Sequence, residues 1–171
     1  MKKFVIGFVA LFVVAISYNA FASTIAVVNL QKILQESKEG KEAKQTIQTL
    51  IEAKKIVIKN KTEALKKLAA KLKNSKLPKK EKDKLQKEYY TKLNLLQQYQ
   101  ANASEEVRQK EVQETNKILS KAIKLIKTYA QKHKIDAVFE ISQGNVIYWN
   151  DALDITQTII KEMDNSKTKK K

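Results

Sequence analysis

A stretch of 97 residues, from Lys38 to Lys134, contains only one cluster of strong helix breakers, and this limits the chain to few folds. The cluster lies near the middle of the stretch, at Asn74, Ser75 and Pro78. The 171-residue chain has only three Gly and one Pro beside abundant Lys, Gln, Glu, Ala and Leu, a composition typical of long helices. We therefore predict two long helices joined by a turn at residues 74–78, which must lie antiparallel.

An apolar repeat of seven residues supports pairing between these helices. On the ascending side it consists of Ile51, Ile58, Leu65 and Leu72, with Ile47 and Leu68 at the companion position and Leu50, Val57 and Ala64 alongside. This is the pattern of a coiled-coil seam. Lys54 and Lys61 fall at the companion position and are expected to loosen it. The returning helix has an apolar stripe at Leu85, Tyr89, Leu93, Leu96, Ala103 and Val107. Arms of about 35 to 55 residues predict a rod about 50 to 80 Å long.

The two ends of the chain supply short strands and helices. Residues 24–29 (TIAVVN) read as a strand, and a helix is expected from Leu30. Two further apolar runs, 135–141 and 146–149, flank a turn at 142–145 and predict a β-hairpin. Asp154 and Gln157 form a candidate capping pair for a last helix. Residues 164–171 are polar and basic and are predicted to be a disordered tail.

The first 22 residues have the pattern of a secretory signal peptide. Lys2 and Lys3 precede an apolar run from Phe4 to Ile16, and Ala20-Phe21-Ala22 is a small-x-small cleavage site. An N-terminal membrane anchor is the alternative, but the run is shorter than the about 20 apolar residues that a spanning helix needs. We expect cleavage after Ala22 and function outside the cytoplasm.

The compact part of the chain is small. Residues 23–37 and 135–163 contribute 44 residues, fewer than a lone hydrophobic core usually requires. No cysteine is available for a disulfide or thiolate metal site, so other subunits are expected to complete this body. The base of the long helices, at Ile118, Ala122 and Ile126, is a second apolar surface that can pack beneath the strands. The candidate body residues are Ile25, Val27, Val28, Val138, Phe139, Ile141, Val146, Ile147, Trp149, Ile155 and Ile159.

Composition also argues against an enzyme. The chain has no cysteine nucleophile, a single histidine, and three separated glycines outside any phosphate-binding pattern. We expect no cofactor and no bound metal. The histidine, His133, is interpreted as a helix-end or packing residue rather than a pH switch.

The order of segments resembles the Skp/OmpH family of periplasmic chaperones. The segments that carry the resemblance are the strand Ile25-Ala26-Val27-Val28-Asn29, the residues around Tyr148, and Asp154-Ile155-Thr156 near the end. The resemblance implies an α+β, mostly α protein: a small β-barrel-like trimerisation body and a long antiparallel α-helical coiled-coil hairpin, or tentacle. It also implies a homotrimer whose tentacles hold unfolded outer-membrane proteins without ATP. Some members associate with anionic lipid or lipopolysaccharide, but no motif here carries over those contacts.

Charge is unevenly distributed. Residues 38–134 have 26 basic and 11 acidic side chains, a net of +15, whereas the body segments have two lysines and six acids. A basic arm attracts acidic partners over about 8 to 10 Å at moderate salt. Together with the resemblance, this predicts client capture by arm lysines and retention by apolar and tyrosine side chains. The candidate client-binding residues are Lys54, Lys55, Lys59, Lys66, Lys67, Lys71, Lys73, Tyr89, Tyr90, Leu95 and Tyr99.

Two alternatives remain open from the sequence. A basic coiled coil could bind polyanions such as nucleic acid or lipopolysaccharide nonspecifically, although no module that reads nucleic acid is recognisable and we expect no specific nucleic-acid partner. The arms could instead form a coiled-coil envelope scaffold without a client. In that case, Tyr89, Leu93 and Leu96 would only seal the seam and the lysines would only solvate it.

Overall fold

The computed structural model describes residues 23–73 and 77–168. The predicted signal peptide (1–22), the centre of the predicted turn (74–76) and the last three residues (169–171) lie outside the described residues. The elements in chain order are β1 (Ile25–Val28), α1 (Leu30–Glu36), α2 (Lys38–Leu72), α3 (Lys79–His133), β2 (Ala137–Glu140), a short 3₁₀ helix (Asp151–Leu153) and α4 (Thr156–Thr168).

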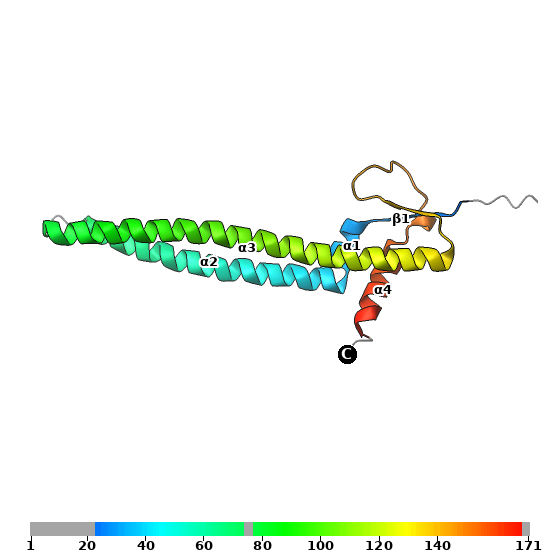
Figure 1. Ribbon diagram of the computed structural model, residues 1–171, viewed down its shortest axis with the longest axis horizontal. Helices are drawn as coiled ribbons and strands as arrows, with labels where there is room; N and C mark the ends of the chain where they lie inside the picture. The colour runs from blue at the N-terminus through cyan, green and yellow to red at the C-terminus, as the bar shows by residue number, and fades with distance from the viewer. Residues whose placement is uncertain (1–22, 74–76, 169–171) are drawn as a thin grey trace, which may run out of the picture.

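Helices α2 and α3 form the predicted antiparallel hairpin. They lie side by side over most of their length and extend away from the remaining elements, which gather at one end (Figure 1). Their 35 and 55 residues correspond to about 52 and 82 Å. Pro78 is the N-cap of α3, where its missing N–H costs no helical hydrogen bond. The predicted seam is confirmed by its buried side chains, which include Leu65, Leu68, Leu96 and Ala103.

The junction between α1 and α2 depends on a close backbone approach. Ser37 is fully buried and has extended backbone angles, which end α1. Its Oγ accepts the Gly40 N–H at 3.1 Å and so caps α2. A Cβ at position 40 would lie 1.8 Å from the carbonyl oxygen of Leu34, so only glycine fits there. The Lys38 N–H donates to Asp164 Oδ1 of α4 at 2.9 Å, which ties α4 to the start of the arm.

The sheet is parallel, and the predicted hairpin of residues 135–149 is wrong. Strand β1 pairs with β2 in parallel, with Val27 opposite Phe139, because the whole α2–α3 hairpin is the crossover between them. The other edge of β1 is occupied near Val27, whose carbonyl accepts the Ile155 N–H at 3.0 Å. Residues 146–149 therefore have no strand partner in the part of the chain that the structure describes, although a turn with Gly144 at φ 74° precedes them.

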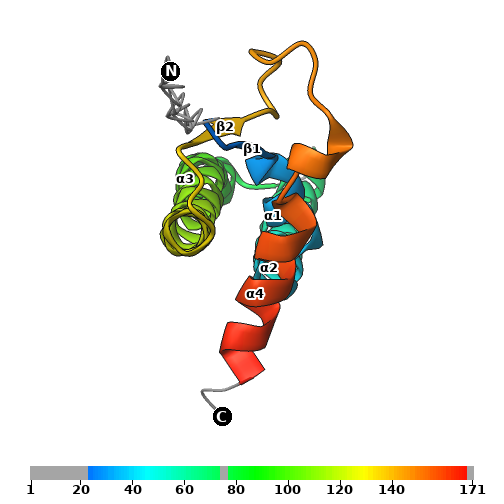
Figure 2. The same cartoon turned by 90° about the vertical axis from the view of Figure 1, so that its right-hand side faces the viewer.

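A single core joins the body segments to the base of α3. Figure 2 shows β1 and β2 beside α3, and α4 passing α1 and α2. The prediction that the arm base packs beneath the strands is confirmed. The buried cluster contains Ala26, Val28, Ile33, Ala43, Ile118, Ala122, Ile126, Ile155, Ile159, Ile160 and Met163. The 44 residues of the body thus obtain part of the missing apolar surface from their own arm.

Helix α4 differs in two respects from the sequence prediction. Asp154 does act at its start, where Oδ1 accepts the Thr156 N–H at 2.8 Å, but the Gln157 amide donates to Glu36 at 2.7 Å instead of closing a capping box. The helix also continues through Thr168, so the disordered tail predicted from residue 164 is wrong for residues 164–168. The apolar face Ile155, Ile159, Ile160 and Met163 explains this extension, since its burial anchors the helix.

Candidate functional site

The predicted capture lysines lie on α2, or in the case of Lys73 directly after its last residue, and differ in their partners. Lys54 is half-buried in the seam, and its Nζ lies 2.5 Å from Glu106 Oε2 of α3. Lys66 is exposed and pairs with Glu63 at 3.0 Å, one turn away on the same helix. The remaining predicted lysines have no carboxylate at ion-pair distance among residues 23–73 and 77–168: Lys55, Lys59, Lys67, Lys71 and Lys73. The outer surface of α2 is therefore rich in uncompensated positive charge.

The predicted retention cluster is divided between the seam and the surface. Tyr89 is half-buried along the seam and makes an edge-to-face contact with Tyr90, with ring centroids 5.8 Å apart. Tyr90 and Leu95 are both more than half exposed. These two side chains therefore present apolar surface that the seam does not bury. Tyr99 is half-buried between α2 and α3, so it lies in the seam rather than wholly on the surface.

Tyr99 also explains how the seam accommodates lysine. Lys54 Nζ and Lys61 Nζ lie 5.9 and 5.4 Å from the centroid of its ring, within the range of a cation–π contact. The hydrogen bond to Glu106 raises the pKa of Lys54, with Coulombic attraction acting in the same direction and desolvation opposing both. Helices α2 and α3 remain in contact at these positions through the Lys54–Glu106 ion pair and the ring of Tyr99, and the loosening expected at Lys54 and Lys61 stays a prediction.

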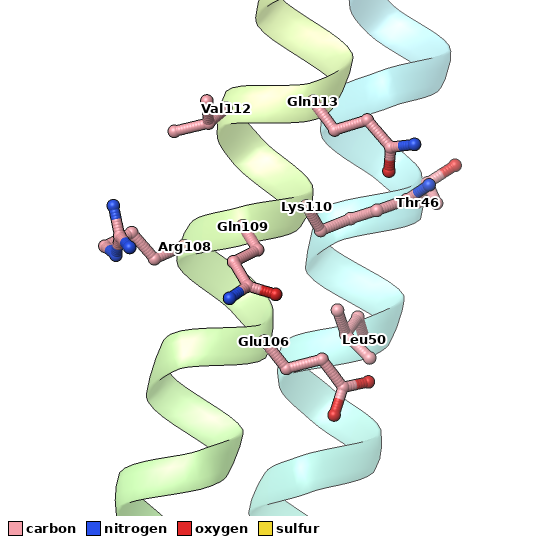
Figure 3. A pocket seen from close by; sticks show the side chains of 8 residues that line it. All are labelled: Thr46, Leu50, Glu106, Arg108, Gln109, Lys110, Val112 and Gln113. Carbon is pink, nitrogen blue, oxygen red and sulfur yellow. The ribbon is translucent and has the colours of Figure 1, made fainter.

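Two hollows lie on the same flank of the hairpin. The larger, of about 630 Å³, is open between the helices, with Leu50 on the α2 side and Glu106, Gln109 and Gln113 on the α3 side (Figure 3). Its cations already have partners: Arg108 binds Glu105 at 2.7 Å, and Lys110 binds Glu114 at 2.7 Å. The Arg108 hydrogen bond lowers the pKa of Glu105 to about 2. The smaller hollow, of about 370 Å³, has Lys61, Ala64 and Leu95 in its lining.

The predicted body residues fall into two groups. Val27, Val28, Ile141, Ile155 and Ile159 are buried within the protomer. The others are half-buried or exposed, and the most exposed, Ile147, has 98% of its surface accessible: Ile25, Val138, Phe139, Val146, Ile147 and Trp149. Tyr148 is 84% exposed beside it. Within residues 23–73 and 77–168, nothing fully covers the apolar side chains of residues 25, 139, 147 and 148 of the body.

Other site types are not found in the described ranges. Within residues 23–73 and 77–168, no group of three or more His, Cys, Asp or Glu side chains could hold a metal ion. In the same ranges, no helix has the length and apolar character needed to cross a bilayer. His133 ends α3 and stacks on Tyr129 with ring centroids 4.1 Å apart, which confirms its interpretation as a helix-end packing residue.

A family model described as outer membrane protein (OmpH-like) matches residues 24–163, which is most of the chain. The chain belongs to this family. An uncharacterized protein of Aquifex aeolicus (strain VF5) is 29% identical over 145 residues, 85% of this chain and 88% of that protein. A crystal structure from Caulobacter crescentus CB15, described as a candidate OmpH-like outer membrane chaperone, has a TM-score of 0.77 and 18% identity, covering 84% of this chain and 85% of that one. This likeness shows a shared fold.

Membership confirms the family assignment made from the strand and C-terminal motifs. OmpH-like proteins form a family of periplasmic chaperones without enzymatic activity. Two features of the present chain were not found from sequence. The sequence analysis treated Lys61 only as a polar residue that weakens the seam, whereas its ammonium group contacts the ring of Tyr99. The close approach at Gly40 was not predicted, although Ser37, three residues earlier, is a recognisable N-cap residue.

Proposed function

We propose that this protein is an ATP-independent periplasmic holdase that captures unfolded outer-membrane proteins and prevents their aggregation. The observation that carries the proposal is the bare, positively charged hairpin. Residues 38–134 have a net charge of +15, and beyond the base α2 and α3 pack only on each other within the described ranges. A long surface of uncompensated lysines with scattered apolar side chains suits weak, movable contact with an unfolded acidic chain.

The proposed active form is a homotrimer that surrounds one cavity with three hairpins. The uncovered apolar surface of the body supports this, because four large apolar side chains of the body segments are exposed: Ile25, Phe139, Ile147 and Tyr148. Apolar groups so exposed usually mark an interaction site. Segment 146–149 also has no strand partner among residues 23–73 and 77–168, as expected of a segment that pairs in an assembly. Cleavage of residues 1–22 after Ala22 would deliver the protein to the periplasm.

The proposed client contacts are the surface lysines of α2 for capture, and Tyr90 and Leu95 for retention. Lys54, Tyr89 and Tyr99 serve the seam first and contact a client through their exposed edges. Anionic lipid or lipopolysaccharide is a further proposed partner of the same basic surface. Release follows from the client's own folding or insertion.

The deciding experiment dilutes a urea-unfolded outer-membrane β-barrel protein into buffer and follows light scattering with and without this protein, at low and high salt. We expect suppression of scattering that weakens as salt rises, since capture depends on screened charges. Scattering that stays unchanged at every ratio of the two proteins would contradict the assignment. A parallel mass measurement in solution should give three times the subunit mass.

A further inference from the structure

One flank of the hairpin differs from the other in chemistry. On α2 the residues just beside the seam on one side are Leu50, Val57 and Ala64, each half-buried. The corresponding positions of the repeat on the other side are Gln48, Lys55 and Thr62, which are all polar. A coiled coil that served only to pair two helices would be expected to carry charged residues on both sides of its seam. The apolar side therefore has exposed surface that pairing does not use.

The two hollows lie along this apolar flank. Leu50 and Ala64 are 14 residues apart on α2, and Leu95 and Gln109 are 14 residues apart on α3, so each pair lies on one face of its helix. The spacing corresponds to about 21 Å along the arm. Tyr99 and Lys54 lie between the hollows, and Lys61, which lines the smaller hollow, also contacts the Tyr99 ring. We call this strip, from Leu50 and Gln109 to Ala64 and Leu95, the Leu95 flank.

Charge distinguishes the two hollows. In the larger hollow Lys110 and Arg108 are neutralised by neighbouring glutamates. Two neutral amides line the same hollow (Figure 3): Gln113, and Gln109, whose Nε2 donates to Glu105 at 2.8 Å and whose Oε1 is an acceptor. In the smaller hollow Lys61 has no carboxylate partner among the described residues, and its Nζ contacts the ring of Tyr99. Leu95 beside it is 51% exposed. An uncompensated ammonium next to an exposed leucine suits a ligand that presents an acidic and an apolar side chain together.

We propose that the Leu95 flank is the client-holding face of each arm and that it takes an extended polypeptide segment in which apolar and acidic side chains alternate. This inference rests on the proposed holdase function and specifies which face performs it. Glutamine amides at one end can bond the backbone of an extended segment, and the other end accepts an apolar side chain over Ala64 and Leu95 beside Lys61. Both hollows are open, so contacts remain shallow and exchangeable. The flank then faces the space that the arms enclose.

The test compares Leu95→Gln with Ile56→Gln as a matched control. Ile56 is an exposed aliphatic side chain of the same size on the same hairpin, 60% accessible, at the repeat position that points away from α3. The probes are two dye-labelled peptides of equal length, one alternating Leu with Asp and one alternating Leu with Lys. Far-UV circular dichroism of both variants checks that the helices are intact.

We expect Leu95→Gln to raise the dissociation constant for the Leu/Asp peptide about threefold to tenfold, and Ile56→Gln to change it less than about twofold. The Leu/Lys peptide should bind the unmodified protein more weakly. A photo-crosslinking residue at position 95 should attach to the peptide, whereas the same residue at position 56 should not.

Three outcomes would overturn the inference: equal effects of both variants, no preference for the acidic peptide, or crosslinking from position 95 mainly to a second copy of this chain. The last would make the flank an interface between arms. Light scattering with the unmodified protein distinguishes failure of the flank assignment from failure of the proposed holdase function. If the protein suppresses aggregation but both variants bind the peptide equally well, the holdase function stands and the flank is misassigned. If peptide binding depends on Leu95 but the protein does not suppress aggregation, the flank binds peptide and the holdase function is wrong.

Discussion

Replacing Gly40 by alanine sets two physical effects of opposite sign against each other. Gly40 lies in the first turn of α2 and has helical backbone angles that alanine adopts freely, so intrinsic propensity predicts stabilisation by about 1 kcal/mol. The structure predicts the opposite. The new Cβ would lie 1.8 Å from the Leu34 carbonyl oxygen and 2.7 Å from its carbon, where ordinary contact begins at 3.4 Å.

Relief of this clash requires α1 and α2 to separate by more than an ångström, because the opposing atoms are backbone and cannot rotate away. Such a shift costs about 1 to 3 kcal/mol by overpacking. It also weakens the Ser37 cap and the Lys38–Asp164 bond, each about 1 kcal/mol. After the propensity gain is subtracted, we expect Gly40→Ala to lower the free energy of unfolding by about 2 to 4 kcal/mol.

The assay is urea unfolding followed by circular dichroism at one fixed protomer concentration, since assembly would otherwise change the apparent stability. Lys41→Ala and Lys41→Gly provide the control. Lys41 is the exposed neighbour in the same helical turn, so the difference between the two variants gives the local value of the propensity effect. If Gly40→Ala is as stable as the unmodified protein or more stable, the close approach of α1 and α2 does not govern this junction.

Three further predictions concern single side chains and charges. Ser37→Ala should cost about 1 to 2 kcal/mol in urea unfolding because a buried cap is lost, and equal stability would show that Gly40 N–H finds another acceptor. Burial alone would raise the pKa of Glu140, but N–H donors of Ser142 and Leu30 outweigh burial and lower it, so the stabilisation is present above the ordinary value of 4.5 and is lost as pH falls below it. Glu140→Gln should reduce the fall of the melting temperature at acid pH. If the melting temperature of the variant falls as steeply as that of the unmodified protein, the role assigned to Glu140 is wrong. Charge reversal at Lys66, Lys67, Lys71 and Lys73 should slow client capture in stopped-flow fluorescence about tenfold at low salt while the assembly keeps its mass; equal loss of both would mean that these lysines serve the body.

The apolar repeat of seven residues and the position of the helix breakers were sufficient to predict the two helices of the hairpin. A helix can be predicted in this way because it needs only local hydrogen bonds and a continuous apolar stripe. The antiparallel pairing then followed from the short turn at 74–78. The contacts that Lys54 and Lys61 make in the seam could not be predicted in this way. A repeat identifies which positions face the partner helix, but it does not show that Tyr99 supplies a ring to both lysines.

The body was less predictable because its contacts join distant parts of the chain. The run Val146-Ile147-Tyr148-Trp149 has the apolar, β-branched and aromatic composition of a strand, but a strand forms only where an edge is free to pair. Here β2 pairs with β1 across 112 positions of sequence, from Ile25 to Ala137, and no short sequence pattern predicts a pairing at this distance. Similarly, the reach of α4 beyond Met163 follows from its anchoring on the arm base rather than from the polar composition of its end.

The charged groups of the body and those of the hairpin have different surroundings, and this leads to a last prediction. Body carboxylates accept backbone N–H groups at short range: Asp136 from Thr24 at 2.7 Å, Glu140 from Ser142 at 2.8 Å and Asp154 from Thr156 at 2.8 Å. Most arm lysines instead point into solvent, where salt screens them.

Raising the ionic strength from about 0.01 to 1 M shortens the Debye length from about 30 to 3 Å. This should greatly weaken suppression of aggregation, while the melting temperature of the protein changes by only a few degrees, because directional bonds to backbone groups are little screened. Light scattering and thermal circular dichroism on the same samples provide the comparison. If stability falls in step with chaperone activity, the arm charges also hold the fold together, and the division between a structural body and a capturing arm is incorrect.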